Sequence, residues 1–224
     1  MQTAALLQED LNDNITRNSI CSDENAILTK VYDTNVNLAI WQRQLSQGVE
    51  ENVADLLTTS KHLDTSSFIR EQCINSDIKD AVKLTALDDA FISNASELVD
   101  MFCTLFELKQ VGLRLRLLDS PMCPRFHVDK VPCRMVTTFS GPGTQWLEHN
   151  QVNRGKLGHG SKGLDDNVSG LFQTQADIKT IGTGDVALLK GEAWMNNENA
   201  GIVHRSPPYQ AGQKRLLMTL DFLY

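Results

Sequence analysis

The chain has 224 residues, of which 41% are hydrophobic and 22% are charged, which is enough for one sizeable domain with an ordinary soluble core. Its formal net charge of −7 argues against a general nucleic-acid binder, because neutralising phosphates needs a basic face. The five cysteines lack C-x-x-C spacing, which disfavours a disulfide framework or a zinc ribbon. No apolar run approaches about 18 residues, and the N-terminus lacks a basic region followed by an apolar one. We therefore expect a cytoplasmic protein without a membrane span.

Glycine and proline divide the chain into two halves of different character. Gly48 is the only glycine before residue 112, and all six prolines and the other thirteen glycines follow that point. Helices tolerate few of either residue, whereas strands and turns use both. We therefore predict a single domain over 1–224, with a mainly helical layer at 1–111 and a β-barrel core at 112–224.

Four segments of the first half are expected to be helical. Residues 36–45 space their apolar side chains like one helix face, as a helix period of 3.6 requires. Residues 49–59 and 65–73 are candidates for short helices. Residues 88–108 form the strongest case, because six large apolar side chains lie on one broad stripe.

The second half alternates apolar and polar residues with the strand period of two. The strands are expected at 112–118, 125–129, 134–140, 178–181, 186–189 and 214–223. The last of these is apolar on one face and more polar on the other, which suits a sheet with helices outside and a wet pocket inside. Residues 148–170 are polar and rich in glycine without periodicity, which indicates a long loop that acts as a lid.

The chemistry of the chain is carried by an H-x-D triplet and a later histidine. In a strand, His127 and Asp129 point to the same face, because residues two apart do so. One imidazole and one carboxylate are two of the three ligands of a facial 2-His-1-carboxylate site, which leaves positions open on the metal. His204 follows the strand-like 186–189 segment and is the candidate for the third ligand. The alternative is a His–Asp hydrogen bond without metal.

Arg215 is the candidate for binding a carboxylate beside that metal. It lies on the polar face of the last predicted strand, eleven residues after His204. A buried arginine can hold a carboxylate through two parallel hydrogen bonds. The alternative is an ordinary salt bridge to Asp221 or another acid. Arg134 and Thr138 are expected to serve in core or rim packing.

The ordered set of H-x-D, G-D-V-x-L-L, His204 and Arg215 resembles the iron(II)- and 2-oxoglutarate-dependent oxygenases. This resemblance implies a double-stranded β-helix, which is a jelly-roll, cupin-like barrel, within an α+β chain whose N-terminal helices cover it. It implies that His127, Asp129 and His204 are the metal ligands and that no other residue is catalytic. It also implies that Arg215 binds the distal carboxylate of 2-oxoglutarate.

Three longer runs resemble an uncharacterised bacterial family, domain of unknown function 1826, over about residues 110–224. The runs are CPRFHVDKVPCRMVTTFSGPGTQWL, GDVALLKGE and VHRSPP…KRLLMTLDF. This second resemblance implies a setting in metal homeostasis, beside metal-handling GTPases of the CobW type, but no particular activity.

Three functions from different classes therefore stand side by side. The first is an iron(II)/2-oxoglutarate oxygenase acting on an unknown small molecule or protein. The second is a non-catalytic protein that binds a divalent metal, zinc or iron. The third is a metal-free β-barrel binding module. The oligomeric state is left open, because no residue pattern bears on it.

Overall fold

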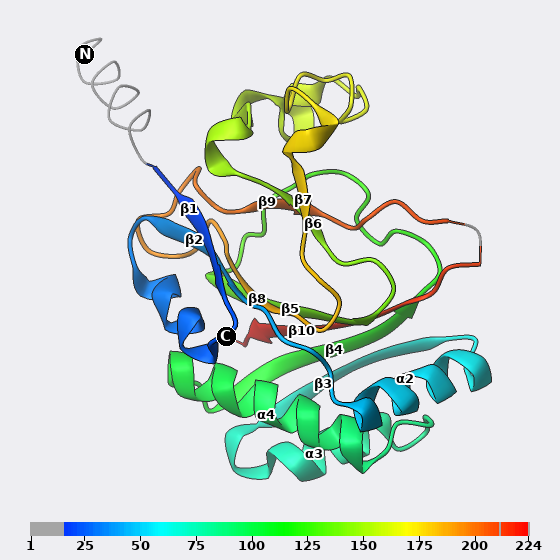
Figure 1. Ribbon diagram of the computed structural model, residues 1–224. Helices are drawn as coiled ribbons and strands as arrows, with labels where there is room; N and C mark the ends of the chain where they lie inside the picture. Colours follow the sequence, from blue (N-terminus) through cyan, green and yellow to red (C-terminus); the bar gives the residue numbers. More distant parts are fainter. Residues whose placement is uncertain (1–15, 211, 224) are drawn as a thin grey trace.

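The computed structural model describes residues 16–210 and 212–223, and within them it combines helices with two β-sheets. Figure 1 shows a large sheet in the middle of the molecule, with three helices on one side and a small sheet on the other. The predicted α+β class is therefore confirmed. The arrangement places the residues of interest between the two sheets, on the face of the large sheet that the helices do not cover.

Seven strands make up the large sheet, in the spatial order β1-β2-β8-β5-β10-β4-β3. Strands β1 and β2 run parallel, and the other neighbours run antiparallel. Their bounds, in the same order, are Asn18–Ser22, Val36–Trp41, Val186–Lys190, Cys133–Ser140, Arg215–Phe222, Gln110–Leu118 and Leu63–Arg70. Strands from both halves of the sequence are thus hydrogen-bonded into one sheet.

The small sheet has three short antiparallel strands, β7 (Ile178–Thr180), β6 (Gln145–Leu147) and β9 (Val203–Arg205), in that order. Beyond β9, His127 forms an isolated antiparallel bridge with His204. An apolar cluster fills the space between the two sheets, because it draws Trp146 from the small sheet and several side chains from the large one. Those side chains are Leu38, Ile40, Val136, Ala187, Leu189 and Leu217.

Three α-helices cover the other face of the large sheet: α2 (Gln47–Thr59), α3 (Ile74–Val82) and α4 (Asp89–Phe106). Helix α4 begins at Asp88, whose carboxylate accepts hydrogen bonds from two backbone N–H groups of the first turn. Its apolar stripe is buried in the main core. None of the helices in the described part of the chain is long and apolar enough to cross a membrane.

The remaining helical pieces are short 3-10 helices. They are η1 (Asn25–Tyr32), η2 (Glu71–Cys73), η3 (His149–Gln151), η4 (Arg154–Lys156), η5 (Gly158–Ser161) and η6 (Gln175–Asp177). Three of them, η3 to η5, lie within 148–170. The rest of that segment forms neither helix nor strand. The predicted long loop at these residues is confirmed.

The alternation predicted for the last strand is borne out in β10. Leu216, Met218 and Leu220 pack in the core under the helices, whereas Leu217 packs between the sheets. Arg215 lies with Leu217 along the same cleft. The strand therefore presents one wholly apolar face to the helices and a mixed face, with Arg215 beside Leu217, to the space between the sheets, as its period of two allows.

Two helices expected in the first half are wrong. Residues 36–41 form β2, which is buried on both faces, so its side chains form a continuous apolar run whose spacing also fits a helix. Residues 63–70 form β3, and only 71–73 are helical, as η2. The expectations at 49–59 and 88–108 are confirmed by α2 and α4. The first half is therefore not a helical layer alone.

The strand expected at 125–129 is also wrong, because only His127 makes a strand-like bridge. The segment lies between Pro124 and Pro132, and proline has no N–H group to donate to a strand ladder. Strand alternation therefore does not explain why His127 and Asp129 lie close together. Their proximity depends on the tertiary structure around them.

Candidate metal centre

The side chains of His127, Asp129 and His204 come together between the sheets. One ligand atom from each residue lies within 4.8 Å of the others. Backbone pairing brings them there: the His127 N–H donates to the His204 carbonyl, and the His204 N–H donates to the His127 carbonyl, both at 3.0 Å. The two imidazole rings consequently lie side by side, with centroids 4.5 Å apart. Two residues far apart in sequence thus form one cluster.

Both histidines direct their Nε2 atoms toward the carboxylate. His127 Nδ1 lies 2.9 Å from the Arg125 carbonyl oxygen, and His204 Nδ1 lies 3.2 Å from that of Ile202. A carbonyl only accepts, so each Nδ1 carries the proton and each Nε2 keeps a lone pair for a ligand. These Nε2 atoms lie 3.8 Å and 3.5 Å from the oxygens of Asp129.

The surroundings of His204 favour its neutral form. Its side chain is buried, and burial lowers its pKa to about 4, although the charge of Asp129 acts in the opposite direction. A metal ligand must be an unprotonated imidazole. Burial therefore keeps this imidazole in the form that a metal ion needs.

Arg134 holds Asp129 in place. Its Nη1 donates to Asp129 Oδ2 at 2.7 Å, while its Nε and Nη2 donate to the two oxygens of Asp221 at 2.7 Å and 3.1 Å. Burial lowers the pKa of Arg134, but the hydrogen bond to Asp221 and the charges of both acids outweigh it and raise that pKa. A carboxylate has two oxygens with about four acceptor positions, so Asp129 can bind Arg134 and still offer an oxygen to a metal.

Arg134 was expected to serve only in packing, but it also holds the carboxylates of Asp129 and Asp221. Arg134 lies opposite Asp221 in the antiparallel pair β5–β10. That register could not be deduced from either strand alone. The strand alternation of β5 is the signal that could have placed Arg134 on the inner face, because the same face carries Val136, which packs between the sheets.

Gly191 lets the backbone of Asp129 pass close to the end of β8. A Cβ atom at this glycine would lie 2.0 Å from the Val131 carbonyl oxygen and 2.8 Å from that of Asp129. The Glu192 N–H donates to the Asp129 carbonyl at 2.9 Å. Any side chain at position 191 would therefore push the loop that carries Asp129 away from β8.

Arg215 has no acidic partner among the described residues, even though its side chain is only 1% exposed. Its Nη2 donates to the hydroxyls of Thr138 at 3.1 Å and Thr144 at 2.7 Å, and its buried Nε has no partner. Burial lowers its pKa to about 10. Asp221, the expected rival partner, pairs with Arg134 instead. Arg215 is therefore a buried cation that lacks a counter-ion.

Arg215 and the two histidines share a narrow cleft of about 50 Å³. Its walls also include Arg134 and Thr144, and Met122 lies among its lining residues, 41% exposed. The metal cluster and the unpaired arginine are thus on the same side of the large sheet, although they come from different strands. A ligand that spans the two would meet imidazoles at one end and a guanidinium at the other.

A second cavity, of about 510 Å³, adjoins His127. Lys156, His159 and Lys162, which belong to the long loop, line it together with Arg125. Asp166 is the acid of this cavity; it is buried and pairs with Arg125 at 3.1 Å and Arg205 at 3.4 Å. The loop therefore lines a mainly cationic space next to the cluster.

The fold resembles that of solved oxygenase structures. The dioxygenase for auxin oxidation 1 of Arabidopsis thaliana, in its 2-oxoglutarate complex, aligns with a TM-score of 0.51 at 12% identity, over 93% of this chain and 92% of that one. A putative oxygenase of Shewanella oneidensis gives 0.49 at 9% identity, over 92% and 89%. HygX of Streptomyces hygroscopicus, with nickel and 2-oxoglutarate bound, gives 0.44 at 10% identity, over 91% and 86%. At 12% identity, the Arabidopsis likeness establishes a shared fold.

Residues 22–221 match the family described as protein of unknown function (DUF1826), and the chain belongs to that family. The resemblance drawn from residues 110–224 therefore extends over most of the first half as well. No curated protein matches the chain.

Proposed function

We propose that this protein is an iron(II)- and 2-oxoglutarate-dependent oxygenase. The two sheets would then be the walls of a double-stranded β-helix barrel, with the helices outside it. The single observation that carries the proposal is a His–Asp–His cluster whose two histidines line the same cleft as a buried arginine that has no acidic partner among the described residues.

The donor set fits a divalent metal. His127, His204 and Asp129 offer two imidazoles and one carboxylate, the donor set of the facial site that leaves positions open for a co-substrate and dioxygen. Zinc accepts the same donors, so the ligands alone do not select iron. When bound, the metal and 2-oxoglutarate supply the oxidising chemistry.

Arg215 favours the oxygenase over a protein that merely stores or carries a metal. A desolvated guanidinium without a counter-ion is costly, and a metal-carrying site has no use for one. The distal carboxylate of 2-oxoglutarate would neutralise it and accept from its free Nε, while Thr138 and Thr144 already orient its Nη2. The cleft is narrow, so binding requires side chains at its mouth to part; Met122 is suited to this by its flexible side chain.

The remaining residues around the cluster would receive the primary substrate. The cavity beside His127 opens next to the metal position, and the 148–170 loop lines it. The part of this chain would be to hold the substrate there and to keep water away, as lid loops do. The substrate, a small molecule or a protein side chain, stays unidentified.

The test is an anaerobic titration of the purified chain with iron(II) and then 2-oxoglutarate, followed by admission of air. We expect stoichiometric iron binding, the weak visible band of the 2-oxoglutarate chelate, and slow formation of succinate even without a primary substrate. Iron binding without the band and without succinate would contradict the oxygenase and indicate a non-catalytic metal-binding protein. Failure to retain iron or zinc after reductive loading would indicate a metal-free binding module.

Arg134→Met should weaken metal binding without preventing it. The variant removes the donor that orients Asp129, and loss of such an outer-shell partner typically costs about 10–100-fold in metal affinity. Iron(II) or cobalt(II) titration measures the change. Arg70→Met is the matched control, because it breaks an arginine–aspartate pair at 2.6 Å on the surface. A folded Arg134 variant with the parent's affinity would contradict the positioning role.

A further inference from the structure

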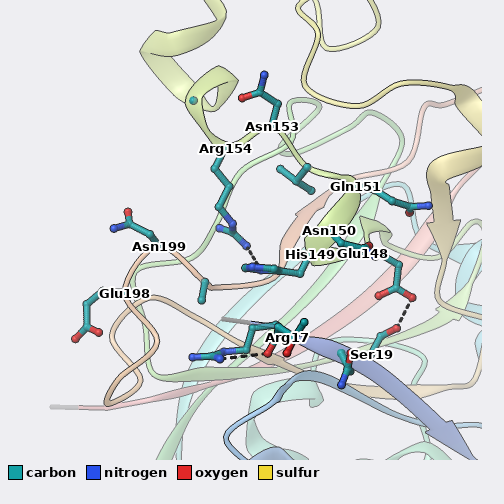
Figure 2. A pocket seen from close by; sticks show the side chains of 15 residues that line it. Arg17, Ser19, Glu148, His149, Asn150, Gln151, Asn153, Arg154, Glu198 and Asn199 are labelled. Carbon is teal, nitrogen blue, oxygen red and sulfur yellow. Dashed lines mark hydrogen bonds between the residues drawn. The ribbon is translucent and has the colours of Figure 1, made fainter. Parts of the chain in front are cut away.

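Figure 2 shows a third cavity, of about 950 Å³, which none of the residues of the candidate metal centre lines. Residues 16–19 at the start of β1, residues 148–155 of the long loop and residues 198–200 line it. It shares none of these residues with the metal cleft or with the cavity beside His127. We refer to it below as the Arg154 pocket.

Arg154 is one of the residues that line this pocket, and its side chain comes from the loop (Figure 2). Its Nη2 donates to the Gly201 carbonyl at 2.7 Å and lies 3.1 Å from His149 Nδ1. Its Nε and Nη1 are buried without a hydrogen-bond partner. Within 16–210 and 212–223, no carboxylate forms an ion pair with it.

Arg17 brings a second cation to the same pocket, and its partners are all neutral. It is 7% exposed, and it donates to Asn197 Oδ1 at 2.8 Å and to the carbonyls of Asn196 at 2.9 Å and Thr16 at 3.3 Å. Burial lowers the pKa of Arg17. Its hydrogen bonds are therefore largely satisfied while its charge is not.

The acids that line the pocket do not compensate these charges. Glu148 accepts hydrogen bonds from Ser19 at 2.7 Å and from Lys179 at 2.5 Å, so it is already paired. Glu198 is exposed at the rim and is not within ion-pair distance of either arginine. The pocket is consequently cationic in a protein whose net charge is −7.

A comparison with two other arginines shows how a missing acid affects the pKa of a guanidinium. Arg134 is half-buried beside two acids, and its pKa is raised. Burial lowers the pKa of Arg154 to about 10, with a smaller contribution from the charge of Arg17 and an opposing one from Glu192. Arg215, the residue that would bind a carboxylate in the metal cleft, shows the same lowering. An uncompensated guanidinium destabilises the fold unless an anion joins it.

We propose that the Arg154 pocket binds a small ligand through a phosphate or carboxylate group, with Arg154 and Arg17 as its cationic partners. The oxyanion would accept from the unpartnered N–H groups of Arg154, and Arg17 would add attraction at longer range. Residues 148–155 line this pocket, and six of the next eight residues, between 156 and 163, line the cavity beside His127. A bound anion would therefore hold the loop that faces the metal cluster, at a site separate from it.

Isothermal titration calorimetry of the whole chain tests this, with inorganic phosphate and citrate titrated separately. We expect one saturable site for at least one of the two anions, and the tighter binder identifies the group recognised. Arg154→Gln should weaken that binding roughly tenfold or more, the size expected for a lost charge-assisted hydrogen bond. Arg43→Gln is the matched control, because Arg43 is also desolvated and donates to neutral oxygens, Gly184 O and Asn94 Oδ1.

A further variant, Arg215→Gln, separates this site from the metal cleft. Anion binding that survives Arg215→Gln and is lost in Arg154→Gln supports the proposal, whether or not the chain proves to be an oxygenase. Binding that is lost in Arg215→Gln and kept in Arg154→Gln overturns it, and so does the absence of binding by both anions. If Arg154→Gln does not fold, Arg17→Gln takes its place with the same expected weakening.

Discussion

His127→Ala is expected to abolish iron(II) binding and, with it, the absorption band seen when 2-oxoglutarate is added. The variant removes one of three donors whose ligand atoms lie within 4.8 Å of one another. Loss of an outer-shell partner already costs about 10–100-fold in metal affinity, and loss of a ligand should cost more. Anaerobic titration and elemental analysis after desalting measure the effect. His127 is preferable to the buried His204 because its removal disturbs the packing less.

His159→Ala is the matched control for this change. It removes an exposed imidazole from the cavity that adjoins His127, so it alters the surroundings of the cluster without removing a donor. We expect it to bind iron like the parent chain. Equal iron binding by the His127 variant and the parent would contradict the metal centre itself. The proposed oxygenase function would then be rejected as well.

Arg215→Met should weaken 2-oxoglutarate binding about 30-fold or more and leave iron binding unchanged. Truncating one partner of a buried, hydrogen-bonded charge pair costs about 2 kcal/mol or more, which corresponds to that ratio of Kd values. The loss should be specific to the distal carboxylate, so pyruvate, which lacks this group, should bind the parent and the variant alike. Titration of the iron-loaded chain with each 2-oxo acid provides the comparison.

The stability of Arg215→Met offers an independent check. Arg215 is 1% exposed without an acidic partner in the described part of the chain, and replacing a buried charge by an apolar side chain of similar volume is often neutral or stabilising. Thermal unfolding of the apo variant should therefore occur at the parent's temperature or above it. Unchanged binding of 2-oxoglutarate by a stable Arg215 variant would mean that the distal carboxylate binds elsewhere. The oxygenase would then have lost its main support.

Much of the architecture followed from local patterns. Helix α4 was predictable because its apolar stripe and the capping Asp88 are adjacent in sequence. Strand β10 was predictable because one alternating segment carries its own division into an apolar and a polar face. Strand β2 was mistaken for a helix because it is buried on both sides, which removes the alternation that identifies a strand.

The candidate site, too, was predictable only in part. The donor types at His127, Asp129 and His204 could be recognised one by one, but the expected strand at 125–129 was the wrong reason for their proximity. The two histidines meet through a bridge between residues 77 positions apart in the numbering. A contact of that range is a backbone bridge between distant segments of the chain, and no local period reports it.

The groups that the chain can offer are already visible in its amino-acid sequence: two imidazoles, a carboxylate and an arginine on the polar face of its last strand. Which arginines have an acid beside them depends on the folded structure. Arg134 faces Asp221 because of the register between β5 and β10, whereas Arg215 meets two threonine hydroxyls. The reason is that a charged side chain is neutralised by groups that are close to it in space, not in sequence. A buried arginine without an acid beside it is destabilised, so it favours binding of an anion.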